Sequence, residues 1–161
     1  MKTKFLFPNK FIKIGLILFS ISILLTSYTN IIGDIHILTK VPVLYFYDSG
    51  VFQKTNIHSF MGFKHDDIQF ELFVTLFVLG CVFAGFSKLK SEDEYTINLR
   101  LESLLWAMYV NFAVFLFSVL FVYGIVFVEI PFYSLLAFLV IYNMRFYYIL
   151  YKSKKSISYE K

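Results

Sequence analysis

Hydrophobic residues form four long continuous runs, separated by shorter polar segments. The runs cover about residues 11–28, 68–86, 103–128 and 132–151. A bilayer core about 30 Å thick requires about 20 mostly apolar residues in helical form, because only a helix or a closed barrel pairs every backbone group in lipid. A barrel would instead show alternating segments of about ten residues. The pattern therefore predicts an all-α integral membrane protein, a four-transmembrane-helix bundle forming one membrane domain over residues 1–161.

The segments between these runs differ in length and character. A tight turn at Glu129 and Pro131 separates the last two runs. A long outer loop, residues 29–67, contains a stretch rich in β-branched and aromatic residues from Val41 to Tyr47, and Asp48-Ser49-Gly50 after it is typical of a turn. A loop of this length is expected to carry structure of its own.

The inner connection, residues 87–102, contains a helix-start signal. In Ser91-Glu92-Asp93-Glu94, the Ser91 hydroxyl can accept the backbone N–H of Glu94 while the Glu94 carboxylate reaches back, which is a capping box. Acidic residues in the first turn also suit the positive end of the helix dipole. We therefore expect one helix to run from Glu92 into the third span, as a cytoplasmic extension of that span.

The distribution of basic residues predicts the orientation, since cytoplasmic segments carry an excess of Lys and Arg. Three basic residues lie in the outer loop and none in the last turn. The other side carries Lys2, Lys4, Lys10, Lys13, Lys88, Lys90, Arg100, Lys152, Lys154, Lys155 and Lys161. Both termini are therefore expected in the cytoplasm. Cleavage of the first run as a signal peptide is the alternative, although no A-x-A site follows it.

Composition excludes several classes of protein. Hydrophobic residues make up 58% of the chain and charged residues 16%, against about 25% charged in a soluble domain. The single Cys excludes a disulfide framework or a CxxC zinc site within the chain. The net charge of +4 is explained by orientation in the membrane, so no nucleic-acid partner is expected. The expected partners are the lipid bilayer and a protein partner or a second copy of the chain.

Candidate metal ligands occur in the outer loop. His36, His58 and His65 lie there beside several Asp residues, and His with carboxylates can bind a metal. Their spacing matches no HxxxH or HExxH pattern, so solvated loop residues are the simpler interpretation. The spans contain no His for haem and no mid-membrane acid for a small exporter. We predict no metal, no cofactor and no enzymatic activity.

Polar residues within the spans are costly and are therefore functional candidates. Asn111 in the third span, and Asn143 and Arg145 in the fourth, fall in the same cytoplasmic half when the two helices run antiparallel. Glu102 is a candidate counter-ion for Arg145. The four residues define a hypothetical intramembrane polar cluster. A purely structural role, in which Arg145 reaches the headgroups and the Asn residues join helices, is the alternative.

Small residues in the second span predict close helix packing. Gly80-x-x-x-Ala84 and Cys81-x-x-x-Gly85 place small side chains on neighbouring faces. Packing within the bundle is the first interpretation, and a homodimer contact is the second.

One part of the chain resembles a known family. Asp93-Glu94, Leu99-Arg100-Leu101-Glu102-Ser103, Trp106-Ala107 and Tyr109-Val110-Asn111 are similar to the signature of small, uncharacterised four-span bacterial inner-membrane proteins. The resemblance covers about the last two thirds of the chain. It implies a four-span fold and carries no activity that can be transferred.

These observations favour a non-catalytic membrane protein that acts by binding, as a sensor, regulator or accessory subunit. One alternative is a small oligomeric transporter or channel that uses Asn111, Asn143 and Arg145. Another is an immunity protein that blocks a membrane-active toxin.

Overall fold

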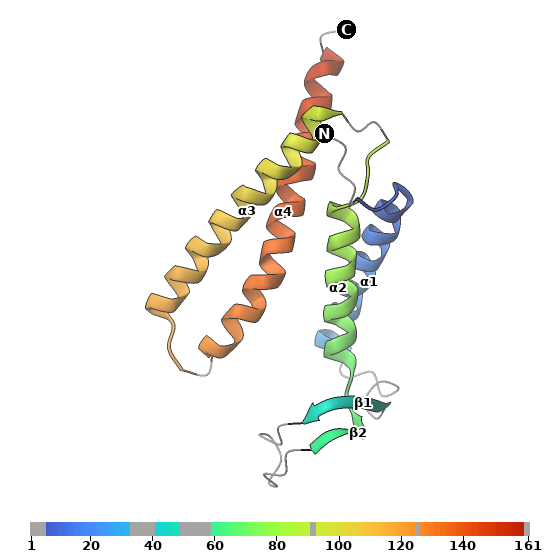
Figure 1. Cartoon of the computed structure of the whole chain (residues 1–161), viewed down its shortest axis with the longest axis vertical. Coiled ribbons are helices and arrows are strands. Elements are labelled where there is room, and N and C mark those ends of the chain that lie inside the picture. Colours follow the sequence, from blue (N-terminus) through green and yellow to red (C-terminus); the bar gives the residue numbers. More distant parts are fainter. Residues whose placement is uncertain (1–5, 33–40, 49–58, 91–92, 125, 160–161) are drawn as a thin grey trace. The chain divides into compact units, whose positions relative to one another are not determined.

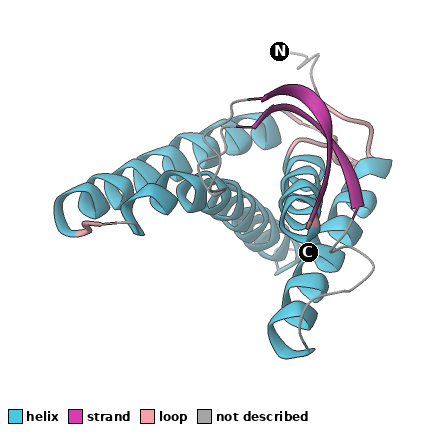
Figure 2. Cartoon of the chain, turned by 90° about the horizontal axis from the view of Figure 1, so that it is seen from below, coloured by secondary structure: helices cyan, strands magenta, loops and turns pink. Residues whose placement is uncertain are grey.

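The structure is a computed structural model of the chain that describes residues 6–32, 41–48, 59–90, 93–124 and 126–159. This part of the chain is mostly helical, and its strands form one two-stranded sheet (Figures 1 and 2). The elements in chain order are α1 (Lys10–Ile32), β1 (Val41–Asp48), β2 (Ser59–Asp66), α2 (Gln69–Gly85), α3 (Glu94–Phe121) and α4 (Val126–Tyr159).

Three of the described helices are long and apolar enough to cross a membrane. These candidate spans are Lys10–Ile31, Glu94–Phe121 and Phe127–Ser153, and α2 is a shorter apolar helix of 17 residues. Most large apolar side chains of α3 and α4 are exposed, and only 6% of the α3 span is buried within the protein. Lipid is the solvent that accepts such surfaces, so the predicted class of membrane protein is supported.

The outer loop contains a β-hairpin, which the all-α prediction left out. The stretch from Val41 to Tyr47 that is rich in β-branched and aromatic residues lies in β1, which pairs antiparallel with β2 in a register that joins Val41 to Asp66 and Leu44 to Phe63. The backbone of Met61 has a positive φ of 54°. Met61 is left out of the strand pairing, since Tyr45 pairs with Gly62 and Tyr47 pairs with Phe60. The predicted turn residues Ser49 and Gly50 lie outside the described residues.

The connection between the last two helices comes earlier than predicted. α3 ends at Phe121 and α4 begins at Val126, so the turn is not at Glu129 and Pro131. Gly124 accounts for the difference, because its φ of +88° is accessible to glycine and breaks the helix. Pro131 lies inside α4 and removes only one backbone hydrogen bond near the start of the helix.

The start of α3 is capped by a different residue from the one predicted. Asp93 is the N-cap, and its carboxylate accepts the backbone N–H and the hydroxyl of Thr96. The helix begins at Glu94, and Ser91 lies outside the described residues. Several neighbouring side chains were able to cap this turn, and Asp93 is the one that reaches the third N–H of the helix. α3 is continuous from Glu94 into the predicted third span, as expected, but it ends at Phe121 rather than at residue 128, and Glu92 lies outside the described residues.

The Asp93 cap gives α3 a pH-dependent stability. The hydrogen bonds from Thr96 lower the pKa of the Asp93 carboxyl below its ordinary value of 3.8. A lowered pKa stabilises the folded state above pH 3.8, and this contribution disappears as the pH falls through the lower folded value. We expect Asp93→Ala to melt slightly below the wild type at neutral pH, and the two melting curves in detergent to converge under strongly acidic conditions.

Glu94→Gln is the matched control for this experiment. Glu94 is also an acid in the first turn, but its exposed carboxylate accepts no hydrogen bond among the described residues. This variant should keep the pH dependence of the wild type. An Asp93→Ala deficit that stayed constant from neutral to acidic pH would contradict the cap.

Residues from α3 and α4 form the core at one end of the antiparallel α3–α4 pair. The buried cluster consists of Leu99, Ala107, Tyr142, Phe146 and Leu150. Ser103 and Ala107 are fully buried, and their small side chains let α4 approach α3 closely.

The chain divides into two compact units, Met1–Ser20 with Phe77–Lys161, and Ile21–Leu76. The boundary falls within α1 and α2, so each of these helices contributes to both units. The α3–α4 pair and the polar side chains described next belong to the first unit.

Candidate functional site

The C-terminal end of α2 is the most polar place inside the first unit. The last carbonyls of a helix have no partners within the helix and must find donors elsewhere. The Tyr142 hydroxyl donates to the Gly85 carbonyl at 2.9 Å, and the Tyr147 hydroxyl donates to the Ala84 carbonyl at 2.7 Å. The Asn143 side-chain amide donates to the Cys81 carbonyl at 3.1 Å. Two consecutive turns of α4 therefore hold the end of α2.

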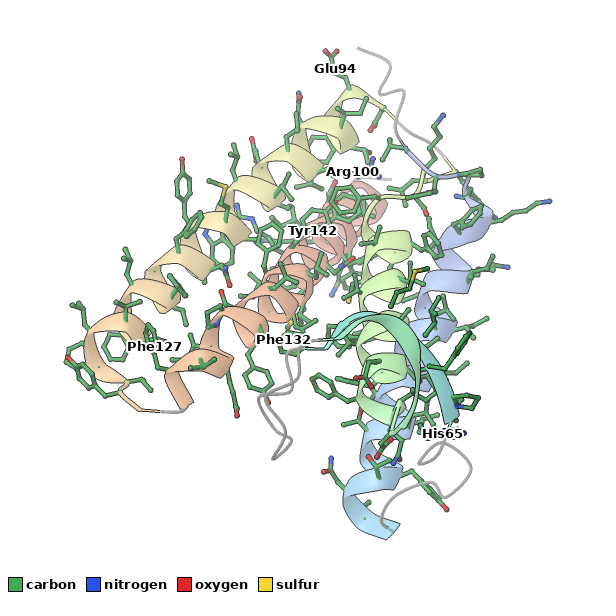
Figure 3. All side chains as sticks on the ribbon, turned by 60° about the horizontal axis from the view of Figure 1, so that its bottom comes forward. His65, Glu94, Arg100, Phe127, Phe132 and Tyr142 are labelled. Carbon is green, nitrogen blue, oxygen red and sulfur yellow. The ribbon has the colours of Figure 1, made fainter. Side chains whose placement is uncertain are left out.

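α3 contributes a cation to the same place. Arg100 is buried, and its guanidinium donates to the Ser87 carbonyl at 3.0 Å, just beyond the end of α2. The same guanidinium lies 5.2 Å from the centre of the Phe146 ring. A positive charge near a helix C-terminus interacts favourably with the helix dipole. Figure 3 shows Arg100 and Tyr142 near each other at this end of the α3–α4 pair. We call Arg100, Tyr142, Asn143 and Tyr147 the α2-end cluster.

An N-terminal segment before α1 also meets the end of α2. Phe7 forms a parallel β-bridge with Ser87, in which the Phe7 N–H donates to the Phe86 carbonyl and the Lys88 N–H donates to the Phe7 carbonyl. The Asn9 side chain adds a bond to the Lys88 carbonyl at 2.7 Å. These hydrogen bonds give partners to the backbone groups of Phe86 and Lys88, which follow the last residue of α2.

Sequence reasoning missed the role of Arg100, which it counted only as a charge of the inner connection. A signal was present, because Thr96, Ser103 and Ala107 repeat at helical spacing around it and mark one face of α3 with small residues. These three residues and Arg100 are all buried. The donors from α4 had no such signal, because Tyr142 and Tyr147 lie in an aromatic-rich run.

The predicted intramembrane polar cluster is distributed among separate places. Asn111 exchanges hydrogen bonds with Ser134, at 2.9 and 3.2 Å, and joins α3 to α4. Asn143 belongs to the α2-end cluster. Glu102 is exposed on α3. No hydrogen bond or ion pair joins the four predicted residues among those that the structure describes. Asn111, Asn143 and Arg145 each contact another partner, and Glu102 is exposed.

Arg145 lies against Trp106 rather than against a carboxylate. Its guanidinium is 4.6 Å from the centre of the Trp106 ring, a cation–π geometry. The Arg145 Nε is buried and donates no hydrogen bond within the described part of the chain. Arg145 therefore has hydrogen-bonding capacity that its own chain does not use.

The small residues of α2 lie against two different helices. A Cβ on Gly80 would meet the Phe19 backbone nitrogen at 2.7 Å, and one on Gly15 would meet the Ala84 nitrogen at 2.5 Å. A Cβ on Gly85 would instead meet the Tyr142 ring at 2.5 Å. Gly80 and Ala84 thus lie close to α1, and Gly85 lies close to α4. Gly15 completes the contact, although the sequence analysis did not single it out.

A pocket of about 180 Å³ lies where α1, α2 and α4 meet. Its lining is mostly aliphatic and aromatic, and it includes Cys81, Asn143 and Tyr147. The donors of Asn143 and Tyr147 are already bonded to α2 carbonyls, so the pocket offers an apolar surface. Within the described residues, no group of three or more His, Cys, Asp or Glu side chains is arranged to hold a metal ion. His65 is exposed on β2, and His36 and His58 lie outside these residues.

Comparison with protein-family models, curated proteins and solved structures gives no match for this chain. A functional assignment for this chain therefore rests on the chemistry of the described residues. Asn111, Tyr142, Asn143 and Tyr147 bond to a neighbouring helix, whereas the guanidinium of Arg145 lies against the Trp106 ring and its buried Nε has no hydrogen-bond partner among the described residues.

Proposed function

We propose that this chain is a non-catalytic accessory or regulatory subunit in the inner membrane of a bacterium and that it acts by binding a protein partner. It spans the membrane four times with both termini in the cytoplasm. The observation that carries the proposal is the large apolar face of α3 that the described residues leave exposed. The side chains of Asn111, Tyr142, Asn143 and Tyr147 are hydrogen-bonded within the chain.

The use of α2 as the fourth span is supported by its length and neighbours. Its 17 residues extend about 25 Å, near the lower limit for crossing a bilayer core of about 30 Å. Gly15 and Gly80 bring the backbones of α1 and α2 together. α2 therefore packs against α1, which is itself long enough to span a bilayer.

The orientation is supported by the positions of the basic residues. Lys10 and Lys13 begin α1, Lys88 and Lys90 follow α2, and Lys152 lies beyond the core-forming part of α4. The bridge between Phe7 and Ser87 joins the first two of these places. An excess of Lys and Arg on one side favours the cytoplasm for that side.

The binding surface is a stripe along α3. We define the α3 stripe as five exposed side chains at helical spacing: Leu105, Tyr109, Phe112, Leu116 and Leu120. Their spacing of three or four residues places them on one side of the helix. Lipid can solvate such a stripe, so exposure alone does not identify a partner. The proposal is that a transmembrane helix of another protein or of a second copy covers it, packing its side chains between those of the stripe.

Site-specific photocrosslinking in cells tests the proposal. A benzophenone amino acid at residue 112 or 116, within the α3 stripe, is expected to give one discrete protein adduct. The matched control is residue 135, because Leu135 is similarly exposed (59%, against 53% for Phe112) but lies on α4. An adduct at twice the mass of the chain would identify a second copy as the partner. Equal and diffuse labelling at all three positions would contradict a binding stripe on α3.

The alternative of an oligomeric transporter or channel has weaker support. It requires Asn111, Asn143 and Arg145 to line one path, whereas Asn111 bonds to Ser134 and Asn143 bonds to the Cys81 carbonyl. No observation among the described residues favours an immunity protein.

A further inference from the structure

Arg145 is a half-buried cation in the apolar helix α4, and no carboxylate among the described residues pairs with it. Among the described residues it forms no ion pair and no hydrogen bond, although one face of its guanidinium covers Trp106. A charge at this position is costly unless it is paired. Glu102, one turn before Trp106 on α3, is exposed and does not pair with it.

Two further side chains with polar groups lie on the same side of α4 as Arg145, toward the C-terminal end of the helix. Tyr148 and Lys152 follow at three and seven residues, which places them on the same side of the helix, and both are exposed. Seven residues correspond to about 10 Å along the axis. Both side chains are long and flexible, so a phosphate between the two positions is within reach of the Arg145 guanidinium and the Lys152 ammonium.

We propose that Arg145, Trp106, Tyr148 and Lys152 bind the phosphate of an anionic phospholipid in the cytoplasmic leaflet. The planar guanidinium matches phosphate oxygens through parallel N–H donors, and Lys152 adds a second positive charge. Aromatic rings such as Trp106 and Tyr148 suit the level of the headgroups, where one side is apolar and the other is wet. The proposal rests on the membrane orientation given above, and it names a ligand that the partner-binding stripe does not require.

Native mass spectrometry with equal amounts of phosphatidylglycerol and phosphatidylcholine measures the preference directly. Both lipids carry a phosphate, but the choline of the neutral lipid places a positive charge beside it that is repelled by Arg145 and Lys152. The wild-type chain should therefore retain the anionic lipid about fivefold over the neutral one, since one cation near the surface contributes about 1 kcal/mol. Arg145→Gln should bring the ratio close to one, and Arg145→Lys should keep part of it. The control is Lys13→Gln, which removes one exposed charge from α1 and should preserve the preference.

Trp106 locates the lipid, because it is the single Trp of the chain. Its fluorescence in phosphatidylcholine nanodiscs should change when phosphatidylglycerol is included, and the change should be absent in Arg145→Gln. Inorganic phosphate added to nanodiscs without phosphatidylglycerol should have no effect. A response to inorganic phosphate alone would overturn the lipid assignment, as would equal retention of both lipids by the wild type, a result that does not depend on any variant folding.

Failure of this proposal is distinguishable from failure of the proposed function. Loss of lipid preference with an intact partner adduct at the α3 stripe would remove the lipid site and keep the subunit role. Lys155→Cys in a Cys81→Ala background reports the orientation. Its labelling by an impermeant maleimide from outside intact cells would overturn the orientation and the lipid site together.

Discussion

Replacing Gly15 by valine is expected to unfold the contact between α1 and α2. The backbone nitrogen of Ala84 and the carbonyl of Gly80 lie 2.5 and 2.8 Å from the position of a Cβ on Gly15. Both obstacles are backbone atoms, so no change of rotamer relieves the clash. Overpacking costs about 1–3 kcal/mol where neighbours can shift, and we expect a loss at or above the upper limit. Equilibrium unfolding of the purified protein in mixed detergent micelles measures it.

Gly124→Ala is the control for this substitution. Nothing lies within 4 Å of a Cβ at this position, and the φ of +88° is the only obstacle. The expected loss is about 1–2 kcal/mol, the cost of a left-handed conformation for a residue with a side chain. A Gly15→Val variant at least as stable as the Gly124→Ala variant would contradict the close approach of α1 and α2.

Tyr142→Ala is expected to have the second large effect. Tyr142 is fully buried, and its ring stacks on Phe86 with centres 5.0 Å apart. Removing a large buried aromatic side chain typically costs about 3–5 kcal/mol. This variant also leaves the Gly85 carbonyl without its donor. We expect the end of α2 to unfold separately from the rest of the protein instead of in one cooperative transition. Equilibrium unfolding in mixed detergent micelles measures this.

Tyr142→Phe separates the hydroxyl from the ring. It keeps the stacking and removes only the hydrogen bond to Gly85, and bonds of this kind contribute about 0.6–1.7 kcal/mol in a membrane. Tyr148→Ala is the exposed control, because 68% of that side chain is accessible, and it should leave stability nearly unchanged. Equal losses for Tyr142→Ala and Tyr148→Ala would contradict the packing described here.

The continuous apolar runs predicted the helices well because their signal is local. A run of about 20 apolar residues determines that a helix forms, and α1, α3 and α4 follow from it. The ends were less predictable. Pro131 suggested a boundary, but a single Pro is tolerated inside a membrane helix, and the φ of Gly124 decided the turn.

The candidate site was harder to predict than the fold because its contacts join distant parts of the sequence. Asn143 was identified as costly, yet its partner is the Cys81 carbonyl, a backbone atom that no composition or spacing marks. Arg100 lies 13 residues from Ser87, and its burial depends on how α3 packs on α4. Arg145 was singled out correctly as unusual, but the proximity of Trp106 required coordinates.

The length of α4 has a mechanical consequence. Its 34 residues extend about 51 Å, roughly 20 Å more than a bilayer core of about 30 Å. In the proposed orientation, the C-terminal part of α4 therefore extends from the core through the headgroups to the cytoplasmic side. A rod without a hinge transmits rotation from one end to the other. A tilt of the α3–α4 pair within the bilayer would therefore swing the lysine-rich tip sideways in water, where another molecule can sense it.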